Sequence, residues 1–267
     1  MEEKLQLSSL PIELLYEIQL YALSHSLPHT SRHFYQIFKD APPSFQAEYI
    51  FRRSLDRPES LYLKALRYPS CSLEVLQFIK RYAEKHAIAP IYSELPKRLF
   101  RDLTPRKDGS HWSDRDHPLP FIRGIYTTGI SPDVNTSSGY ALTKAVQSGF
   151  IPLVQLLLEK GALPAHKDNL TVRVAIRQKN LQMVRQLIER TDRVDHGPSK
   201  EKRKLEIERT DSVDHGPSKK RRKLEDRVTV TKEMLKLAVK CNAQDIVDYF
   251  TKEKGCVPDL QTLYLMH

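Results

Sequence analysis

Three histidines near the start of the chain have a spacing that could bind a metal ion. His25, His29 and His33 are four residues apart, so a continuous helix would place their imidazoles on one face, where they could ligate zinc. Pro28 stands between them and breaks such a helix, and no carboxylate completes a ligand set. We therefore expect solvated histidines, with no metal and no cofactor.

A second polar cluster, Asp114, Asp116 and His117, falls in a proline-flanked stretch without a nucleophile nearby. A polar loop over residues 104–118 is the simpler interpretation. Trp112, the only tryptophan, lies in this stretch, and we expect it to anchor the loop to the neighbouring helices. The chain also lacks a glycine-rich phosphate loop, a G-x-S-x-G motif and an H-E-x-x-H motif. These observations favour a protein that is not an enzyme and has no small-molecule substrate.

The composition is that of an ordinary soluble protein. The chain has 267 residues, of which 40% are apolar and 28% charged. No apolar run approaches the ~20 residues that a membrane span needs, and the first residues lack the basic start and cleavage site of a signal peptide. The three cysteines are too few and too scattered for a disulfide framework or a zinc site. We expect a reducing compartment, nuclear or cytoplasmic or both, and no membrane partner.

Half of the positive charge lies in one duplicated segment. Residues 189–207 and 208–226 are nearly identical copies, and their Gly-Pro, Ser and dense charge predict a disordered insertion. The net charge of the chain is +10; between residues 200 and 223, ten basic and five acidic residues give 10 − 5 = +5. The second copy contains a basic run that is typical of a nuclear localisation signal, with importin as its partner. Its members are Lys219, Lys220, Arg221, Arg222 and Lys223. A solvated loop that no receptor reads is the alternative, and charge alone gives only non-specific DNA binding.

Residues 139–163 have a pattern that resembles one ankyrin repeat. Leu142 and Ala145 match the Leu and Ala of the family's T-P-L-H-x-A signature, and Gly149 matches the glycine between its two helices. Ala141 and Thr143 depart from the signature proline and histidine. Because such a unit cannot bury its apolar face alone, the resemblance implies further copies on both sides.

Two further segments repeat this pattern in phase. The aligned positions are Ala145, Val154 and Leu157, then Ala175, Val184 and Leu187, then Ala238, Val247 and Phe250. Lys179 and Asn180 replace the first unit's Gly-Phe turn, and we expect Asn180 to take the left-handed conformation there. Gly255 corresponds to Gly161. Residues 117–135 and 61–82 read as more degenerate units upstream, although any array of helical hairpins would have the same periodicity.

The N-terminal segment, residues 7–42, predicts a helical hairpin. Leu14, Leu15, Ile18 and Leu23 form an apolar stripe at helical spacing. Pro28 ends this helix, and Thr30 or Ser31 can cap a second one that carries Phe34, Ile37 and Phe38. One interpretation is a cap that covers the exposed end of a repeat array.

The same segment resembles an F-box. The family's opening L-P-x-E-L…I pattern is matched by Leu10, Pro11, Glu13, Leu14 and Ile18, and its later positions by Leu27, Ser31 and Phe34. The resemblance implies docking onto the linker subunit of an SCF ubiquitin ligase, and the residues expected to bind it are Leu10, Pro11, Leu14, Leu15, Ile18, Leu27 and Phe34. The family's later Trp-containing portion is missing, and Phe34-Tyr35 stands in its place.

Together, the two resemblances point to an F-box/ankyrin protein of the kind found in fungi. We expect an all-α fold that begins with an F-box-like hairpin (1–50) and degenerate ankyrin-like helices (51–103). Ankyrin repeats (104–188), the disordered basic insert (189–227) and a C-terminal repeat (228–267) follow. The expected function is a non-catalytic adaptor of an SCF-type ligase, and the alternative is a nuclear ankyrin scaffold or transcriptional co-regulator whose hairpin only caps the array.

In either case the repeats would bind a target protein on the surface formed by finger tips and first helices. The residues expected on that surface are Asp133, Asn135, Lys144, Gln147, Arg173 and Arg177. Their polar, mildly basic character suggests an acidic or phosphorylated target.

Overall fold

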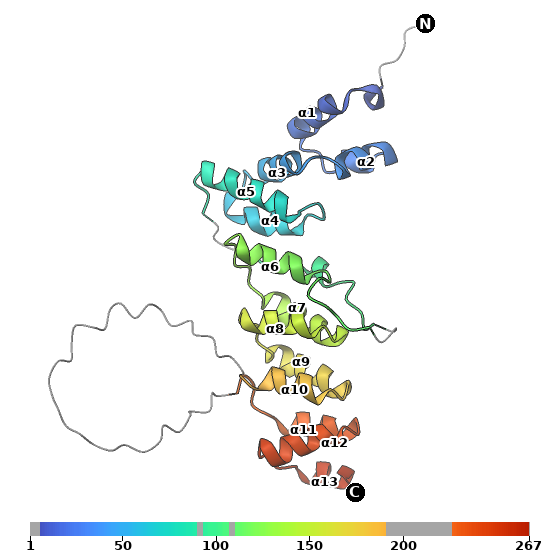
Figure 1. The fold of residues 1–267 in the computed structure, drawn as a ribbon, viewed down its shortest axis with the longest axis vertical. Coiled ribbons are helices and arrows are strands. Elements are labelled where there is room, and N and C mark those ends of the chain that lie inside the picture. Colours follow the sequence, from blue (N-terminus) through green and yellow to red (C-terminus); the bar gives the residue numbers. More distant parts are fainter. Residues whose placement is uncertain (1–5, 90–92, 107–109, 191–225, 267) are drawn as a thin grey trace, which may run out of the picture. The chain divides into compact units, whose positions relative to one another are not determined.

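The computed structural model describes residues 6–89, 93–106, 110–190 and 226–266, and these are helices joined by turns and loops (Figure 1). In the described residues the one departure from helix and loop is an isolated bridge between Glu94 and Asp133, so the all-α expectation is confirmed. The chain forms two compact units, residues 1–162 and 163–267, which are considered separately. No helix within the described ranges is both long and apolar enough to cross a membrane.

Unit 1 begins with three helices, α1 (Ile12–Ala22), α2 (Arg32–Lys39) and α3 (Pro43–Arg52). Ser31 caps α2, because its hydroxyl oxygen accepts a hydrogen bond from the Phe34 backbone N–H at 3.2 Å. Of the two caps expected, Thr30 or Ser31, the structure therefore uses the serine.

A small core holds α1 and α2 together. Leu15, Phe34 and Phe38 are buried in it, and Tyr16 packs against Phe45 with ring centroids 4.4 Å apart.

The predicted apolar stripe of α1 is only partly correct. Of Leu14, Leu15, Ile18 and Leu23, only Leu15 is buried. The other buried residue of α1 is Gln19, which is 2% exposed. The face that α1 turns inward runs through positions 15 and 19, one helical turn apart, and Leu14 consequently lies outside it.

The larger core of unit 1 is formed by α3 together with α4 (Leu61–Arg67) and α5 (Leu73–Lys85). Ile125 of α6 (Leu119–Thr127) joins the same cluster. Short 3-10 turns connect these helices: η1 (Leu7–Ser9), η2 (Leu27–His29), η3 (Pro58–Ser60) and η4 (Lys97–Leu99).

Unit 1 ends with a helix–turn–helix pair, α7 (Thr136–Ser148) and α8 (Ile151–Glu159), which pack against each other (Figure 1). The loop before α6 is fixed to this pair by Trp112. Its indole N–H donates to the Ser148 carbonyl oxygen at 2.8 Å, and its ring stacks on Phe150 with centroids 4.6 Å apart. The expected anchoring role of this tryptophan is confirmed.

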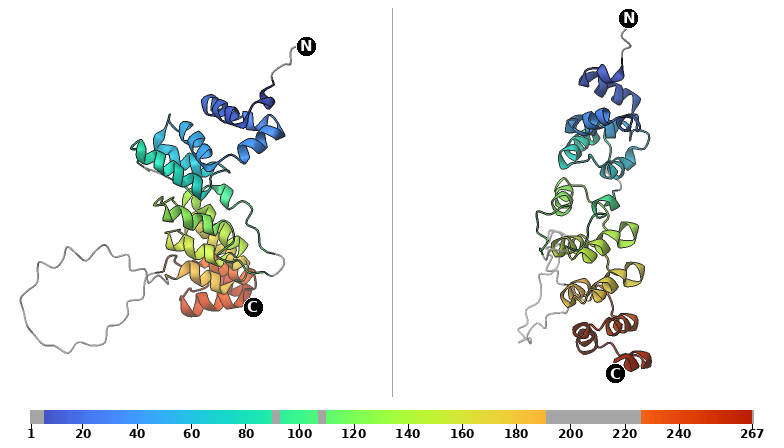
Figure 2. Two further views of the ribbon diagram at one scale, coloured as in Figure 1. Left: turned by 45° about the horizontal axis from the view of Figure 1, so that its top comes forward. Right: turned by 90° about the vertical axis from the view of Figure 1, so that its right-hand side faces the viewer.

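Unit 2 contains two more pairs. The first is α9 (His166–Arg177) with α10 (Leu181–Ile188). The second is α11 (Lys232–Lys240) with α12 (Gln244–Asp248), which continues into the π-helical turn η5 (Tyr249–Glu253). A last helix, α13 (Leu260–Met266), packs against α11 (Figure 2).

The three pairs share the same turn. In each, the backbone N–H five residues after the aligned alanine donates to that alanine's carbonyl oxygen: Phe150 to Ala145 (3.0 Å), Asn180 to Ala175 (3.2 Å) and Ala243 to Ala238 (3.0 Å). The residue before each donor is left-handed: Gly149 (φ 71°), Lys179 (φ 54°) and Asn242 (φ 51°).

The expectation that Asn180 would be left-handed is therefore wrong by one residue. Lys179 takes that conformation, and Asn180 caps α10 instead, with its side-chain oxygen accepting from the Met183 N–H at 2.9 Å. An asparagine oxygen satisfies one of the free N–H groups of the first helical turn, which a lysine cannot do.

The last pair carries one extra residue. Ala162 donates its N–H to Leu157, five residues back, whereas Cys256 donates to Phe250, six residues back, both at 2.9 Å. The wider turn of η5 accommodates the added residue. Gly161 and Gly255 then both take positive φ, 87° and 66°.

The chain segments on either side of residues 191–225 are hydrogen-bonded to each other. The Arg227 N–H donates to the Ile188 carbonyl oxygen at 2.7 Å, at the end of α10. The Arg227 guanidinium also donates to the Gln186 and Glu189 carbonyl oxygens at 3.2 and 2.7 Å. Nearly all of the predicted basic insert, with Lys219–Lys223, lies outside the described residues.

Candidate functional site

The first candidate site is an apolar surface at the start of α1. Ile12, Leu14 and Leu7 are 48%, 44% and 40% exposed, and Pro11 between them is also exposed. We call these four residues the α1 surface. Large apolar side chains that face water within one short segment make this segment a candidate binding surface.

The seven residues of the F-box-like prediction divide into two groups. Pro11 and Leu14 belong to the α1 surface. The remainder hold the hairpin together or are half-buried beside it: Leu10, Leu15, Ile18, Leu27 and Phe34. The prediction did not include Leu7 and Ile12. Their large apolar side chains, within a few positions of Pro11, are the feature of the sequence that could have indicated them.

The residues predicted for target binding are also spread over different roles. The Asp133 carboxylate accepts the Asn135 backbone N–H at 2.9 Å, and the Asn135 side chain donates to the Gly161 carbonyl oxygen at 3.0 Å. Lys144 is half-buried and Gln147 is exposed on α7. Arg173 and Arg177 are exposed on α9, in unit 2.

The histidine row does not form a metal site. Across the described parts of the chain, no group of three or more His, Cys, Asp or Glu side chains could hold an ion. The three histidines do not share one α-helix, because the 3-10 turn η2 ends at His29. His25 and His29 lie with ring centroids 5.7 Å apart.

A groove of about 730 Å³ lies beside the N-terminal hairpin, lined mainly by aromatic and histidine side chains of α2 and its surroundings. Gln19 borders it and is almost fully buried. Its side-chain N–H donates to the Ser24 carbonyl oxygen at 2.7 Å, while its Oε1 has no hydrogen-bond partner.

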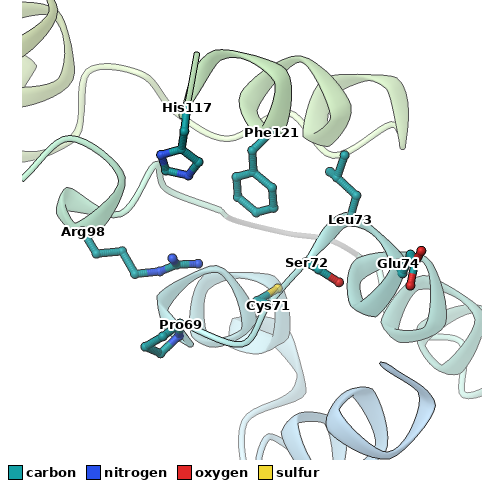
Figure 3. A pocket seen from close by; sticks show the side chains of 8 residues that line it. All are labelled: Pro69, Cys71, Ser72, Leu73, Glu74, Arg98, His117 and Phe121. Atoms are coloured by element: carbon teal, nitrogen blue, oxygen red, sulfur yellow. The ribbon is translucent and has the colours of Figure 1, made fainter. Parts of the chain in front are cut away.

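A second pocket, of about 490 Å³, joins three separate parts of unit 1 (Figure 3). Cys71 and Ser72 come from the turn before α5, Arg98 from η4, and His117 and Phe121 from the start of α6. We call it the Arg98 pocket. The remaining lining residues are Pro69, Leu73 and Glu74.

Burial is the largest cause of the pKa shifts in the Arg98 pocket. Burial raises the pKa of the Cys71 thiol to about 12, although the nearby Arg98 charge acts to lower it. Burial, and then the same arginine, lower the pKa of His117 below its usual value. Cys71 is thus a neutral thiol at physiological pH, the opposite of the thiolate that nucleophilic catalysis requires.

The two aspartates of the other polar cluster, Asp114 and Asp116, form ion pairs with nearby arginines, while its histidine, His117, lines the Arg98 pocket. The Asp116 carboxylate accepts the Ser113 backbone N–H at 2.6 Å and pairs with Arg106 at 2.8 Å, and these contacts lower its pKa, the Ser113 backbone bond most. Asp114 pairs with Arg123 at 3.1 Å.

Comparison with models of protein families, with curated proteins and with solved structures found no match.

Proposed function

We propose that this chain is a non-catalytic recruiting adaptor of an SCF-type ubiquitin ligase. The α1 surface would bind the linker subunit of the ligase, and the helix pairs, which we propose to be ankyrin-type repeats, would bind a target protein. The observation that carries the proposal is the exposure of Ile12 and Leu14 on α1, and of Leu7 and Pro11 just before it, next to a Leu15 that is buried in the hairpin core.

The geometry of the turns supports the repeat assignment. The three pairs share a buried alanine, a left-handed residue four positions later and the same backbone hydrogen bond. In addition, α7 and α9 each begin with three left-handed residues, thirty positions apart: Ser137, Ser138 and Gly139, then Lys167, Asp168 and Asn169. Units that recur every 20 to 50 residues, roughly, are typical of solenoids, and ankyrin units have a period of about 33 residues.

The test is copurification of the full chain with the SCF linker subunit. The double variant Ile12→Asp plus Leu14→Asp places two charges on the α1 surface, and we expect it to abolish binding, because buried unpaired charges strongly oppose association. Leu55→Asp is the matched control, since Leu55 is 52% exposed elsewhere in unit 1. Absence of binding by the unmodified chain, or equal binding by the double variant, would refute the proposal.

A second candidate function, a nuclear ankyrin scaffold whose hairpin is a cap, is favoured by contacts between α1 and α3. The Tyr49 hydroxyl of α3 donates to the Ser24 carbonyl oxygen at 2.8 Å, just after α1, and Arg52 donates to the Leu20 carbonyl oxygen at 3.4 Å. On this hypothesis the same double variant would lower the unfolding temperature of unit 1. If the double variant unfolds at the same temperature as the unmodified chain but no longer binds the linker subunit, the adaptor function is supported over the cap.

The localisation proposed is nuclear, cytoplasmic or both. It depends on Lys219–Lys223 being read by importin, and fluorescence microscopy of a variant with these five residues changed to alanine tests it. Retention in the nucleus would contradict the signal.

A further inference from the structure

We propose that the Arg98 pocket binds a phosphate monoester, the phosphate of a phosphorylated side chain in a partner protein. This rests on the adaptor function and deepens it by naming what the target would present; the pocket lies outside the α1 surface and outside the three helix pairs, so it would add a further contact with the target.

The first argument is a charge without a counter-ion. Arg98 Nε donates to the Leu66 carbonyl oxygen at 3.0 Å, but Nη2 is buried with no hydrogen-bond partner. None of the ion pairs among the described residues involves Arg98. A half-buried guanidinium in this state lacks a compensating anion, which is costly. Phosphate oxygens match its fork of N–H donors.

The second argument is that a ring nitrogen lies beside the guanidinium in the pocket. The Ser72 hydroxyl oxygen accepts the Val75 N–H at 3.2 Å and lies across the pocket from Arg98 (Figure 3). His117, neutral because its pKa is lowered, still carries one ring N–H. Figure 3 shows the Arg98 guanidinium and the His117 ring on the same side of the pocket.

The acidic groups that line the pocket are neutral or lie away from Arg98, and the further carboxylate whose charge reaches His117 is Asp102, which acts to raise the pKa of this histidine. The Cys71 thiol is protonated at physiological pH. Glu74 lies on the far side of the pocket from the Arg98 guanidinium (Figure 3). Arg98 and His117 thus line the side of the pocket opposite Glu74.

The walls favour an organic phosphate over a free ion. Phe121, Leu73 and Pro69 give the pocket an apolar side, and its volume of about 490 Å³ exceeds that of a phosphate alone. Pockets of this kind use apolar walls for contact area and a few polar groups for orientation. Phenyl phosphate is thus the simplest probe of both parts.

The experiment is isothermal titration calorimetry of the full chain with phenyl phosphate, inorganic phosphate and phenol at constant ionic strength. We expect phenyl phosphate to bind with a dissociation constant on the order of 1 mM, a modest affinity that suits a probe of this size. Inorganic phosphate should bind more weakly and phenol should not bind. Equal binding of inorganic and phenyl phosphate would overturn the assignment to a phosphorylated side chain.

Variants locate the binding. Arg98→Gln should raise the dissociation constant about tenfold, the effect of losing one charge-assisted pair. Arg101→Gln is the matched control, because Arg101 is exposed and the charge change is the same; it should change the constant less than about twofold. Circular dichroism checks the fold, and His117→Gln serves as a second variant if Arg98→Gln is unfolded.

No heat of binding, or binding that both arginine variants weaken equally, would refute the proposal. No linker subunit is present in this titration. A failed copurification therefore rejects the adaptor function but leaves phosphate binding by the Arg98 pocket standing. A failed titration rejects phosphate binding but leaves the adaptor function standing.

Discussion

Helices α1 and α8 are both rich in apolar residues, yet they bury them differently. In α8, Leu153, Val154 and Leu157 are fully buried. In α1, Ile12 and Leu14 are about half exposed, and Gln19 occupies an inward position instead. Since α8 pairs with α7 through a tight turn, its apolar face is covered locally. The α1 surface has no such cover among the described residues, and this exposure is the reason that we propose it as a partner-binding surface.

The largest predicted effect is a difference in unfolding free energy between truncating a buried leucine of α8 and truncating an exposed leucine of α1. Leu157→Ala leaves a cavity in a closed core and should lower the free energy of unfolding of unit 1 by about 2–5 kcal/mol. Leu14→Ala should change it by less than about 0.5 kcal/mol, because the side chain is about half exposed and lies outside the hairpin core. Urea denaturation followed by circular dichroism measures both, and similar losses would show that the α1 surface is packed.

A smaller effect concerns the loop that Trp112 attaches to the α7–α8 pair. Trp112→Ala removes the stacking on Phe150 and the bond to the Ser148 carbonyl oxygen, and should lower the free energy of unfolding by about 1–3 kcal/mol. Trp112→Phe keeps a ring for stacking and should cost about 1 kcal/mol. A full loss with phenylalanine would instead assign the stabilisation to the hydrogen bond.

The equivalent turns of the α7–α8 and α9–α10 pairs predict changes in stability of opposite sign. A β-carbon added at Gly149 would meet no atom within 4 Å, and the φ of this residue is 71°, so Gly149→Ala should cost about 1 kcal/mol through its backbone alone. Lys179→Gly at the equivalent turn should stabilise unit 2 by up to about 1 kcal/mol. Thermal unfolding of the two variants measures this, and a loss of stability in Lys179→Gly would break the equivalence of the turns.

The last prediction concerns the reactivity of the Cys71 thiol in the Arg98 pocket. With its pKa raised to about 12, Cys71 holds almost no thiolate at pH 8. We expect iodoacetamide to label Cys241 and Cys256, which are partly exposed, well before Cys71. Urea should abolish the difference, because the pKa returns to its ordinary value in the unfolded chain. Mass spectrometry follows the labelling, and early alkylation of folded Cys71 would contradict the burial.

Much of the helical architecture could be predicted because periodicity determines burial. Ala145, Ala175 and Ala238 are each fully buried, as their common phase predicts. The exchange of roles between Lys179 and Asn180 was not predicted, since intrinsic tolerance of positive φ was weighed without the competing need for a helix cap. The candidate sites were harder: Asn135, which we predict to bind a target, also donates to Gly161 within unit 1, and no spacing in the sequence indicates this bond.

The sequence by itself determined that the chain is helical, where the paired helices α7 to α12 lie and which of their positions are apolar, because these follow from local spacing. Only the tertiary structure decided that α1 turns Leu15 inward and leaves Leu14 outside, because a rotation of one residue about the helix axis reverses the choice. It also brought together Ser72, Arg98 and His117. No local pattern links residues so far apart in the chain, and only packing places them around one pocket.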